Sequence, residues 1–101
     1  MLTPILEVVI YEIKPDFAKG YRLHHLPRFQ ELVKNLPGFI SFRTLGNCNQ
    51  HNLYLDLVEW KSLEHAVSAA NSIQQIQKSK EYQGYLEAFD KVKMFHHFKP
   101  L

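Results

Sequence analysis

The residues of this chain best suited to acid–base chemistry are its histidines, of which there are six in 101 residues. A neutral imidazole can accept a proton near neutral pH, as a general base must. His96 and His97 are consecutive on a predicted strand, so their side chains should point to opposite faces of a sheet. His25 lies four residues after Tyr21 on a predicted helix, beside its apolar stripe. We therefore take His25, His96 and His97 as candidate bases. The competing interpretation is a half-exposed or hydrogen-bonded structural histidine.

The same histidines do not favour a metal site. No two of them have the i, i+4 spacing that places two ligands on one face of a helix. The single cysteine, Cys48, lies in a polar segment with no cationic neighbour in the sequence, so a catalytic thiolate is not expected there. There is also no glycine-rich dinucleotide-binding pattern. We expect neither a metal nor a cofactor.

A second set of residues could line a binding pocket. Aromatic rings hold planar ligands by stacking, and a tyrosine hydroxyl can orient one polar edge. Asp56 stands between apolar neighbours in a predicted strand and needs a partner or water. Arg43, on the neighbouring strand, could pair with Asp56 or anchor an anionic ligand. Ordinary core packing is the competing interpretation for the aromatic residues. The candidate pocket residues are Trp60, Tyr21, Tyr54, Tyr82, Tyr85, Arg43 and Asp56.

Four predicted strands would position these residues. Residues 5–13 (ILEVVIYEI) are rich in β-branched residues and are apolar on both alternating sets, so we expect both faces to be covered. Residues 39–45 and 92–98 are the second and fourth strands. Residues 53–60 form the third, in which Leu53, Leu55 and Leu57 point one way and Tyr54, Asp56, Val58 and Trp60 the other. Polar residues 46–52 suit a hairpin loop.

Two helical regions complete the pattern. Residues 17–36 repeat apolar side chains at three- and four-residue spacing, with Asp16 as a plausible N-cap and a break expected near Leu26, because Pro27 lacks an amide donor. Ser62 should cap the second helical region. Its predicted packing stripe is Leu63, Ala66, Val67 and Ala70, and restarts are possible at Ser72 and Ser79.

The element order is therefore βαββαβ. Right-handed crossovers then predict an α+β, ferredoxin-like fold, with a four-stranded antiparallel sheet and helices on one face. The other face would be apolar and uncovered, which favours pairing with a second identical chain. Residues 1–101 form one domain.

Three stretches carry a resemblance to a known family: Leu36-Pro37-Gly38-Phe39-Ile40-Ser41-Phe42-Arg43, the strand end Asp56–Trp60 followed by Lys61-Ser62-Leu63-Glu64, and the final His-bearing strand. Over residues 5–99 the chain resembles the dimeric α+β barrel superfamily, and within it the antibiotic biosynthesis monooxygenase-like family. The resemblance implies a homodimer joined through its sheets, with a pocket between sheet and helices. It also implies candidate activities, because the family includes cofactor-free oxygenases of polycyclic aromatics and quinols as well as heme-degrading oxygenases.

The resemblance disfavours heme degradation. The heme-degrading branch pairs an Asn on the first strand with a Trp and a His on later helices. In this chain Val9 stands at the Asn position, and a small residue near Ala69 stands at the Trp position. Trp60 is the only Trp and matches the strand-end Trp of the fold.

Composition excludes some partners. The net charge of +2 is too small to indicate nucleic acid, and no apolar run approaches the length of a membrane helix. The segment Met1-Leu2-Thr3-Pro4 lacks the pattern of a signal peptide, so we expect a cytoplasmic protein.

These observations support three hypotheses. The first is a small dimeric protein that binds an apolar or aromatic molecule and acts as a cofactor-independent monooxygenase of phenols or quinols. The second is a non-catalytic dimeric module that binds a ligand or acts in a stress response. The third is isomerase or lyase chemistry on a small ring compound.

Overall fold

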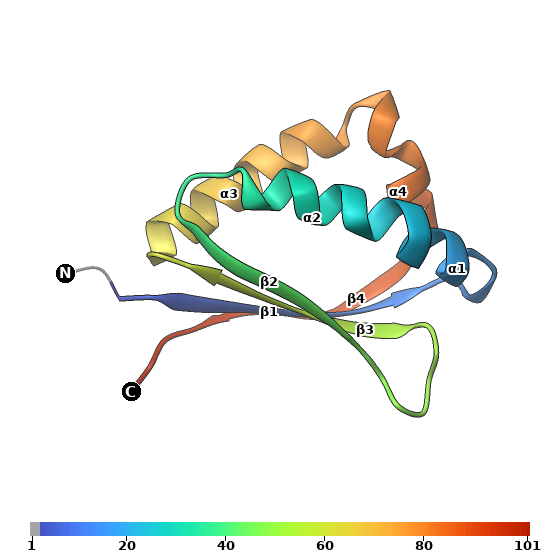
Figure 1. Cartoon of the computed structure of the whole chain (residues 1–101), viewed down its shortest axis with the longest axis horizontal. Helices are drawn as coiled ribbons and strands as arrows, with labels where there is room; N and C mark the ends of the chain where they lie inside the picture. Colours follow the sequence, from blue (N-terminus) through green and yellow to red (C-terminus); the bar gives the residue numbers. More distant parts are fainter. Residues whose placement is uncertain (1–2) are drawn as a thin grey trace.

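Four strands form one antiparallel sheet, and the helices all lie on one side of it (Figure 1). The computed structural model describes residues 3–101, so the first two residues of the N-terminal segment discussed above lie outside it. The elements in chain order are β1 (Ile5–Ile13), η1 (Pro15–Phe17), α1 (Ala18–Gly20), η2 (Tyr21–His25), α2 (Leu26–Lys34), β2 (Phe39–Gly46), β3 (Leu53–Trp60), α3 (Leu63–Gln77), η3 (Lys80–Tyr82), α4 (Gln83–Ala88) and β4 (Phe89–Phe98).

The sheet has the strand order β2-β3-β1-β4, which confirms the predicted ferredoxin-like α+β fold. β1 lies between β3 and β4 and pairs with both in antiparallel register. Val9 stands opposite Asp56, and Glu7 opposite Val58. Burial along β3 alternates as predicted, with Tyr54, Asp56, Val58 and Trp60 buried beneath the helices. The register therefore fixes which polar groups share the helix-covered face.

The first helical region changes its geometry where Pro27 predicts a break. α2 begins at Leu26 with Pro27 in its first turn, and the backbone at His25 is also helical, so one helical segment continues into the next. The five preceding residues, Tyr21–His25, form a π-helical stretch. Asp16, predicted as the N-cap, lies inside the short 3-10 turn η1, and none of these first helical pieces has a side-chain cap. That prediction is wrong because the first turn starts two residues earlier, with Lys14 at the N-cap position and its carbonyl accepting a hydrogen bond from the Phe17 amide.

α3 is capped as predicted but packs differently. The hydroxyl of Ser62 accepts a 3.2 Å hydrogen bond from the His65 amide. Of the predicted stripe, Ala66 is buried, whereas Leu63 and Val67 are about half exposed, and Ala69, which the stripe did not include, is buried. Small side chains at the contact let a helix approach the sheet closely, and here they set the buried face. α3 continues without a restart at Ser72, and Ser79 precedes η3 without capping it through its side chain.

β4 starts at Phe89, three residues earlier than predicted. The backbone becomes extended at Phe89, directly after α4 ends at Ala88. The pairing of β4 with β1 has register irregularities at Ile10/Tyr11 and Glu12/Ile13. The early start places Phe89 against the buried core cluster that contains Tyr11.

Gly38 fixes the turn between α2 and β2. Its φ of 84° lies in the left-handed region, which side chains other than glycine rarely adopt. A Cβ at this position would also clash with the side chain of His65. The Gly38 carbonyl accepts a 2.8 Å hydrogen bond from the Lys61 amide, which ties the turn to the end of β3.

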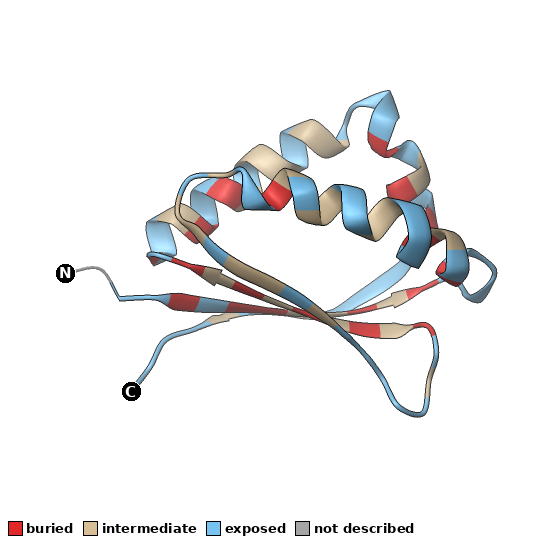
Figure 2. Ribbon diagram, in the orientation of Figure 1, coloured by how far each residue is buried: buried red, intermediate tan, exposed pale blue. Residues whose placement is uncertain are grey.

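The core lies between the sheet and the helices (Figure 2). The other sheet face carries apolar side chains with no helix over them: Leu6, Val8 and Ile10 on β1 alternate with the inward-facing residues of that strand. Leu55 and Leu57 of β3, Met94 of β4 and the half-exposed Phe98 stand opposite them. Among residues 3–101, no helix combines the length and apolar character needed to cross a membrane.

Candidate functional site

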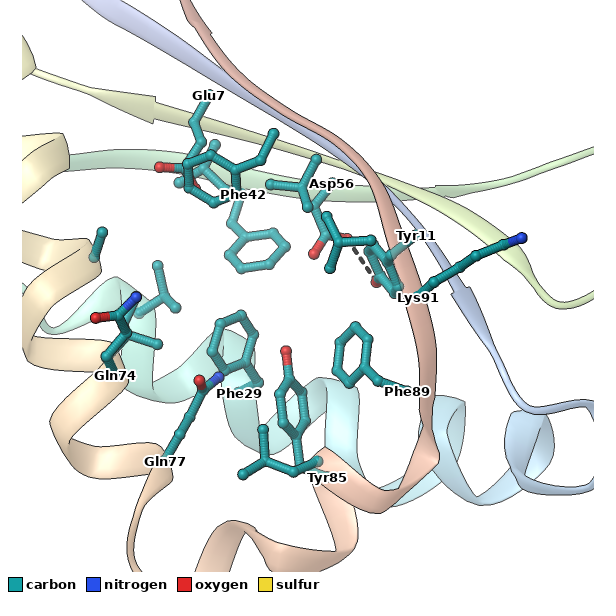
Figure 3. A pocket seen from close by; sticks show the side chains of 18 of the residues that line it. Glu7, Tyr11, Phe29, Phe42, Asp56, Gln74, Gln77, Tyr85, Phe89 and Lys91 are labelled. Atoms are coloured by element: carbon teal, nitrogen blue, oxygen red, sulfur yellow. Dashed lines mark hydrogen bonds between the residues drawn. The ribbon is translucent and has the colours of Figure 1, made fainter.

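A cavity of about 540 Å³ lies between the sheet and the helices (Figure 3). Every strand and the helices α2, α3 and α4 contribute to its wall, which is mostly apolar. Its size is within the range of small-molecule sites. Among the residues that line it are Glu7, Tyr11, Phe29, Phe42, Asp56, Gln74, Gln77, Tyr85, Phe89 and Lys91.

Asp56 lies on the sheet floor of this cavity and is 5% exposed. Its Oδ1 accepts a 2.9 Å hydrogen bond from the Tyr11 hydroxyl and a 2.8 Å bond from the Thr44 hydroxyl. Burial raises the pKa of Asp56 to about 6, although the two hydroxyl donors act in the opposite direction. Both hydrogen bonds end on Oδ1, which leaves Oδ2 for a ligand.

The two donors of Asp56 belong to a longer chain of hydrogen bonds. The Tyr11 hydroxyl lies 2.7 Å from the Tyr21 hydroxyl. Because Tyr11 donates its only proton to Asp56, Tyr21 donates to Tyr11. On the other side, the Thr44 hydroxyl accepts a 3.3 Å hydrogen bond from the Gln30 amide. The carboxylate is thus held by neutral groups from two helical segments and two strands.

Glu7 is a second carboxylate on the same floor. Its Oε1 lies 3.0 Å from Nε2 of His97, which stands opposite it on β4. Burial raises the pKa of Glu7, and His97 acts in the opposite direction. Since Glu7 pairs with Val58 and Asp56 with Val9, the two carboxylates are diagonal neighbours, with side chains about 7–8 Å apart in such an arrangement.

Aromatic rings form the wall opposite the sheet. The Tyr85 ring stacks on Phe29 with centroids 4.9 Å apart and meets Phe89 edge to face at the same separation. In Figure 3 the Tyr85 hydroxyl points from α4 into the cavity, and the Gln74 and Gln77 amides point in from α3. Burial raises the pKa of Tyr85 well above its usual range, and the Tyr21 and Asp56 charges add to that effect. Tyr85 therefore stays protonated as a hydrogen-bond donor.

The structure brings two of the predicted pocket residues, Asp56 and Tyr85, into the cavity. Tyr21, Tyr54 and Tyr82 are buried in the core cluster around Tyr11 instead of lining it, and Trp60 is buried in the second cluster, around Val33. These four residues therefore belong to the packed core, as the competing interpretation of the aromatic residues expects.

Arg43 does not lie in the pocket, and its predicted ion pair with Asp56 is wrong. Arg43 stands opposite Leu57, on the sheet face away from the helices, whereas Asp56 pairs with Thr44 on the covered face. The hydrogen bond that Arg43 was expected to supply comes from Thr44.

None of the three candidate histidines lines the cavity. His97 faces it and reaches it only through Glu7, while His96 stands opposite Val8 on the other sheet face. The ring of His25 packs on α4, where a Cβ at Gly84 would lie 2.8 Å from His25 Cε1. Within residues 3–101, no three His, Cys, Asp or Glu side chains gather closely enough to hold a metal ion.

Sequence reasoning missed Glu7, Tyr11 and Thr44. Glu7 had the same signal that identified Asp56, a carboxylate inside an apolar strand, and Tyr11 lies on the same face of that strand. Thr44 carries no such signal, because a threonine is ordinary in a strand. Its role depends on the register between β2 and β3.

No protein-family model matches the sequence, and no curated protein matches it either. Solved structures do match it in fold. One is a candidate antibiotic biosynthesis monooxygenase from Bordetella bronchiseptica, with a TM-score of 0.74, 14% identity and 98% of each chain covered. Another is SnoaB, a cofactor-independent oxygenase from Streptomyces nogalater, with a TM-score of 0.69, 12% identity, and coverage of 98% of this chain and 94% of that one.

A third is the heme-degrader MhuD from Mycobacterium tuberculosis, solved with two hemes bound in its active site. It has a TM-score of 0.77, 15% identity, and coverage of 96% of this chain and 95% of that one. These neighbours act differently, so their shared architecture does not choose among activities. The chain therefore shares the ferredoxin-like α+β fold of these solved structures, among them candidate antibiotic biosynthesis monooxygenases.

Proposed function

We propose that the cavity binds a planar phenol or quinol and that the protein oxidises it with molecular oxygen, without a cofactor. The observation that carries the proposal is the arrangement of Asp56 and Tyr85. A carboxylate with its pKa raised to about 6 and a protonated tyrosine hydroxyl face one aromatic-walled cavity from opposite sides. A ligand hydroxyl between them would donate to Asp56 and accept from Tyr85. The cofactor-independent oxygenase among the fold neighbours supports the same choice.

The residues would act in a simple sequence. Asp56 takes the hydroxyl or enol proton of the substrate, and Tyr85 donates a hydrogen bond to the oxyanion that develops. The electron-rich anion passes one electron to O2, and the resulting radical pair forms a carbon–oxygen bond. Loss of water then gives a quinone. For an anthrone, one methylene carbon loses two hydrogens and gains one oxygen atom, and the second oxygen atom leaves as water.

The cavity does not fit heme. Within residues 3–101 its lining contains no histidine that could ligate iron. Val9 and Ala69 remain at the positions where the heme-degrading branch has Asn and Trp, and Ala69 is packed in the core rather than along the cavity. Two carboxylates on the floor would also repel the propionates of heme.

Oxygen uptake with a panel of anthrones and naphthohydroquinones tests the proposal. The wild type should consume one O2 per substrate. Asp56→Asn should lower the rate by about 100-fold or more, as expected for loss of a general base. Tyr85→Phe should also lower it by about 100-fold, as expected for loss of an oxyanion donor. Glu87→Gln, at an exposed carboxylate of α4 outside the cavity lining, is the control and should retain full activity.

One observation favours a non-catalytic ligand-binding module: the three candidate histidines lie outside the cavity wall. The same panel separates the two functions. Ligand binding without oxygen uptake would support the binding module and contradict the oxygenase. Uptake that persists unchanged in Asp56→Asn would contradict the assigned base.

We also propose that the protein is a homodimer that pairs through the uncovered sheet face. Leu6, Val8 and Ile10 there form an apolar surface together with Leu55 and Leu57, on the side away from the helices. A second copy would remove this surface from water, and the interface would be the same on both subunits.

A further inference from the structure

The charges around the cavity are strongly one-sided. Within residues 3–101, its ionisable lining residues other than tyrosine are Glu7, Asp56, Asp90 and Lys91. The Lys91 side chain extends away from the cavity in Figure 3, and Arg43 lies on the opposite face of the sheet. Three carboxylates therefore border the space, and no basic side chain points into it.

The charge of Asp56 is not neutralised locally. Its partners, Tyr11 and Thr44, are neutral hydroxyls. They stabilise the carboxylate by donating hydrogen bonds, but they leave a full negative charge at the cavity floor. Glu7 adds to it, since its one ionic partner is His97, which is positive only when protonated.

The opposite end of the cavity offers no compensation. Gln74 and Gln77 point inward from α3 (Figure 3), and their amides are neutral. An acidic ligand group would lie next to carboxylates if it faced the sheet floor. It would lie next to uncharged amides if it faced α3. Neither orientation gives an anion the cationic partner that a buried charge requires.

We infer that this cavity is an electrostatic filter: it admits uncharged planar aromatic ligands, with a hydroxyl facing Asp56, and rejects ligands that carry a carboxylate, sulfonate or phosphate. The inference rests on the proposed ligand site and narrows its substrate class. It concerns binding alone and does not depend on the oxygenase chemistry.

Calorimetry with four shape-matched probes tests the filter: β-naphthol, its methyl ether, β-naphthoate and the methyl ester of β-naphthoate. The measurement is made at pH 8, where Asp56 is ionised because its pKa is about 6. The wild type should bind β-naphthol at least about 30-fold more tightly than β-naphthoate, because a like charge nearby disfavours the anion. The methyl ether should bind about 5- to 10-fold more weakly than β-naphthol, since it cannot donate to the carboxylate.

Asp56→Asn supplies the decisive comparison. It should strengthen β-naphthoate binding by at least about 10-fold and leave binding of the uncharged ester within about 2-fold, because only the anion senses the lost charge. Glu7→Gln should give a smaller gain, since that carboxylate is partly offset by His97. Glu87→Gln, at an exposed carboxylate of α4 that does not line the cavity, is the surface control and should change neither affinity. Circular dichroism confirms that each variant is folded.

Equal affinity of the wild type for β-naphthol and β-naphthoate would overturn the inference. An equal gain in affinity for β-naphthoate and its methyl ester in Asp56→Asn would also overturn it. That result would mean that the substitution acts through the polarity of the cavity and not through its charge. Failure of every probe to bind would overturn both the filter and the ligand site. If the protein discriminates against anionic probes but consumes no oxygen, the inference about the cavity stands and the proposed oxygenase activity is wrong.

Discussion

The hydroxyl of Tyr11 lies 2.9 Å from Oδ1 of Asp56, and the two residues belong to neighbouring strands of the sheet. Their pairing is diagonal, because Tyr11 stands opposite Tyr54 and Asp56 opposite Val9. A second donor, Thr44, reaches the same oxygen from β2, on the other side of β3. Burial raises the pKa of this carboxylate, and the two hydroxyl donors on Oδ1 limit how far it rises.

Removing one of these donors should raise the pKa of Asp56. Thr44→Val keeps the shape of the side chain and deletes the hydroxyl, so the ionised form loses a hydrogen bond and becomes less stable. The acidic limb of any activity that needs ionised Asp56 should move to higher pH by about one unit. NMR titration of the Asp56 carboxyl carbon measures the shift directly.

Thr44→Ser is the control for that experiment, since it restores the donor and should return the pKa toward about 6. An unchanged titration in Thr44→Val would show that the hydroxyl does not act on the carboxylate.

Asp56 should make stability fall as pH rises. Its pKa is raised from 3.8 to about 6 in the folded protein, so the folded state binds the proton more tightly than the unfolded state. The stabilising contribution is complete below the unfolded pKa and is lost as pH rises through the folded pKa. A shift of about two units corresponds to about 3 kcal/mol between pH 3 and pH 8.

Denaturant unfolding of wild type and Asp56→Asn across this range checks the effect. The difference in unfolding free energy between the two proteins should move in favour of the variant as pH rises. Glu87→Gln, at an exposed carboxylate of α4 outside the cavity lining, is the control. A difference that stays constant from pH 3 to pH 8 would contradict the assigned shift.

Gly38→Ala should destabilise the protein by about 2 kcal/mol or more. The residue has a φ of 84°, and a side chain there would clash with His65. Gly46→Ala is a matched control, because a Cβ at Gly46 meets nothing within 4 Å. Chemical denaturation should show a large loss for Gly38→Ala and little change for Gly46→Ala. Similar losses in both would mean that the turn does not require glycine.

Leu57→Asp should convert the proposed dimer to a monomer. Leu57 stands opposite both Val8 and Arg43 near the middle of the uncovered sheet face, where a carboxylate would be desolvated in an interface. Sedimentation velocity at micromolar concentration measures the change. Leu23→Asp, at a 60% exposed position on the helical side, should leave the dimer intact. A monomeric wild type would remove the basis of the proposal.

The strands could be predicted from sequence because their apolar residues alternate or run continuously, and β1 and β3 have the predicted bounds. The buried face of α3 could not be read in the same way. Leu63 and Val67 are larger and more hydrophobic than Ala69, so periodicity favoured them. Ala69 is buried instead because α3 lies close to the sheet. That distance depends on how the whole chain packs and cannot be read from the sequence of the helix.

The site could be predicted only where one residue conflicts with its surroundings. Asp56 was identifiable as a carboxylate in an apolar strand, and the structure places it on the cavity floor. Arg43 was misplaced, because a one-residue change in register between β2 and β3 decides whether Arg43 or Thr44 shares its face. The histidines attracted attention by their chemistry, but side-chain type alone does not say which of them borders an internal space.

The π-helical stretch Tyr21–His25 also sets the rotational phase of the N-terminal helical region. A π-helical turn holds about one residue more than an α-helical turn, which rotates the preceding segment by about 100° relative to an uninterrupted helix. That rotation brings the fully buried Tyr21 hydroxyl to Tyr11 while Phe29, farther along, still reaches the cavity. Deletion of Leu23 would restore a regular α-helix and rotate the Tyr21 hydroxyl away from the Tyr11 hydroxyl. The extra residue of the π-helical stretch thus places Tyr21 in the hydrogen-bond chain that runs through Tyr11 to Asp56.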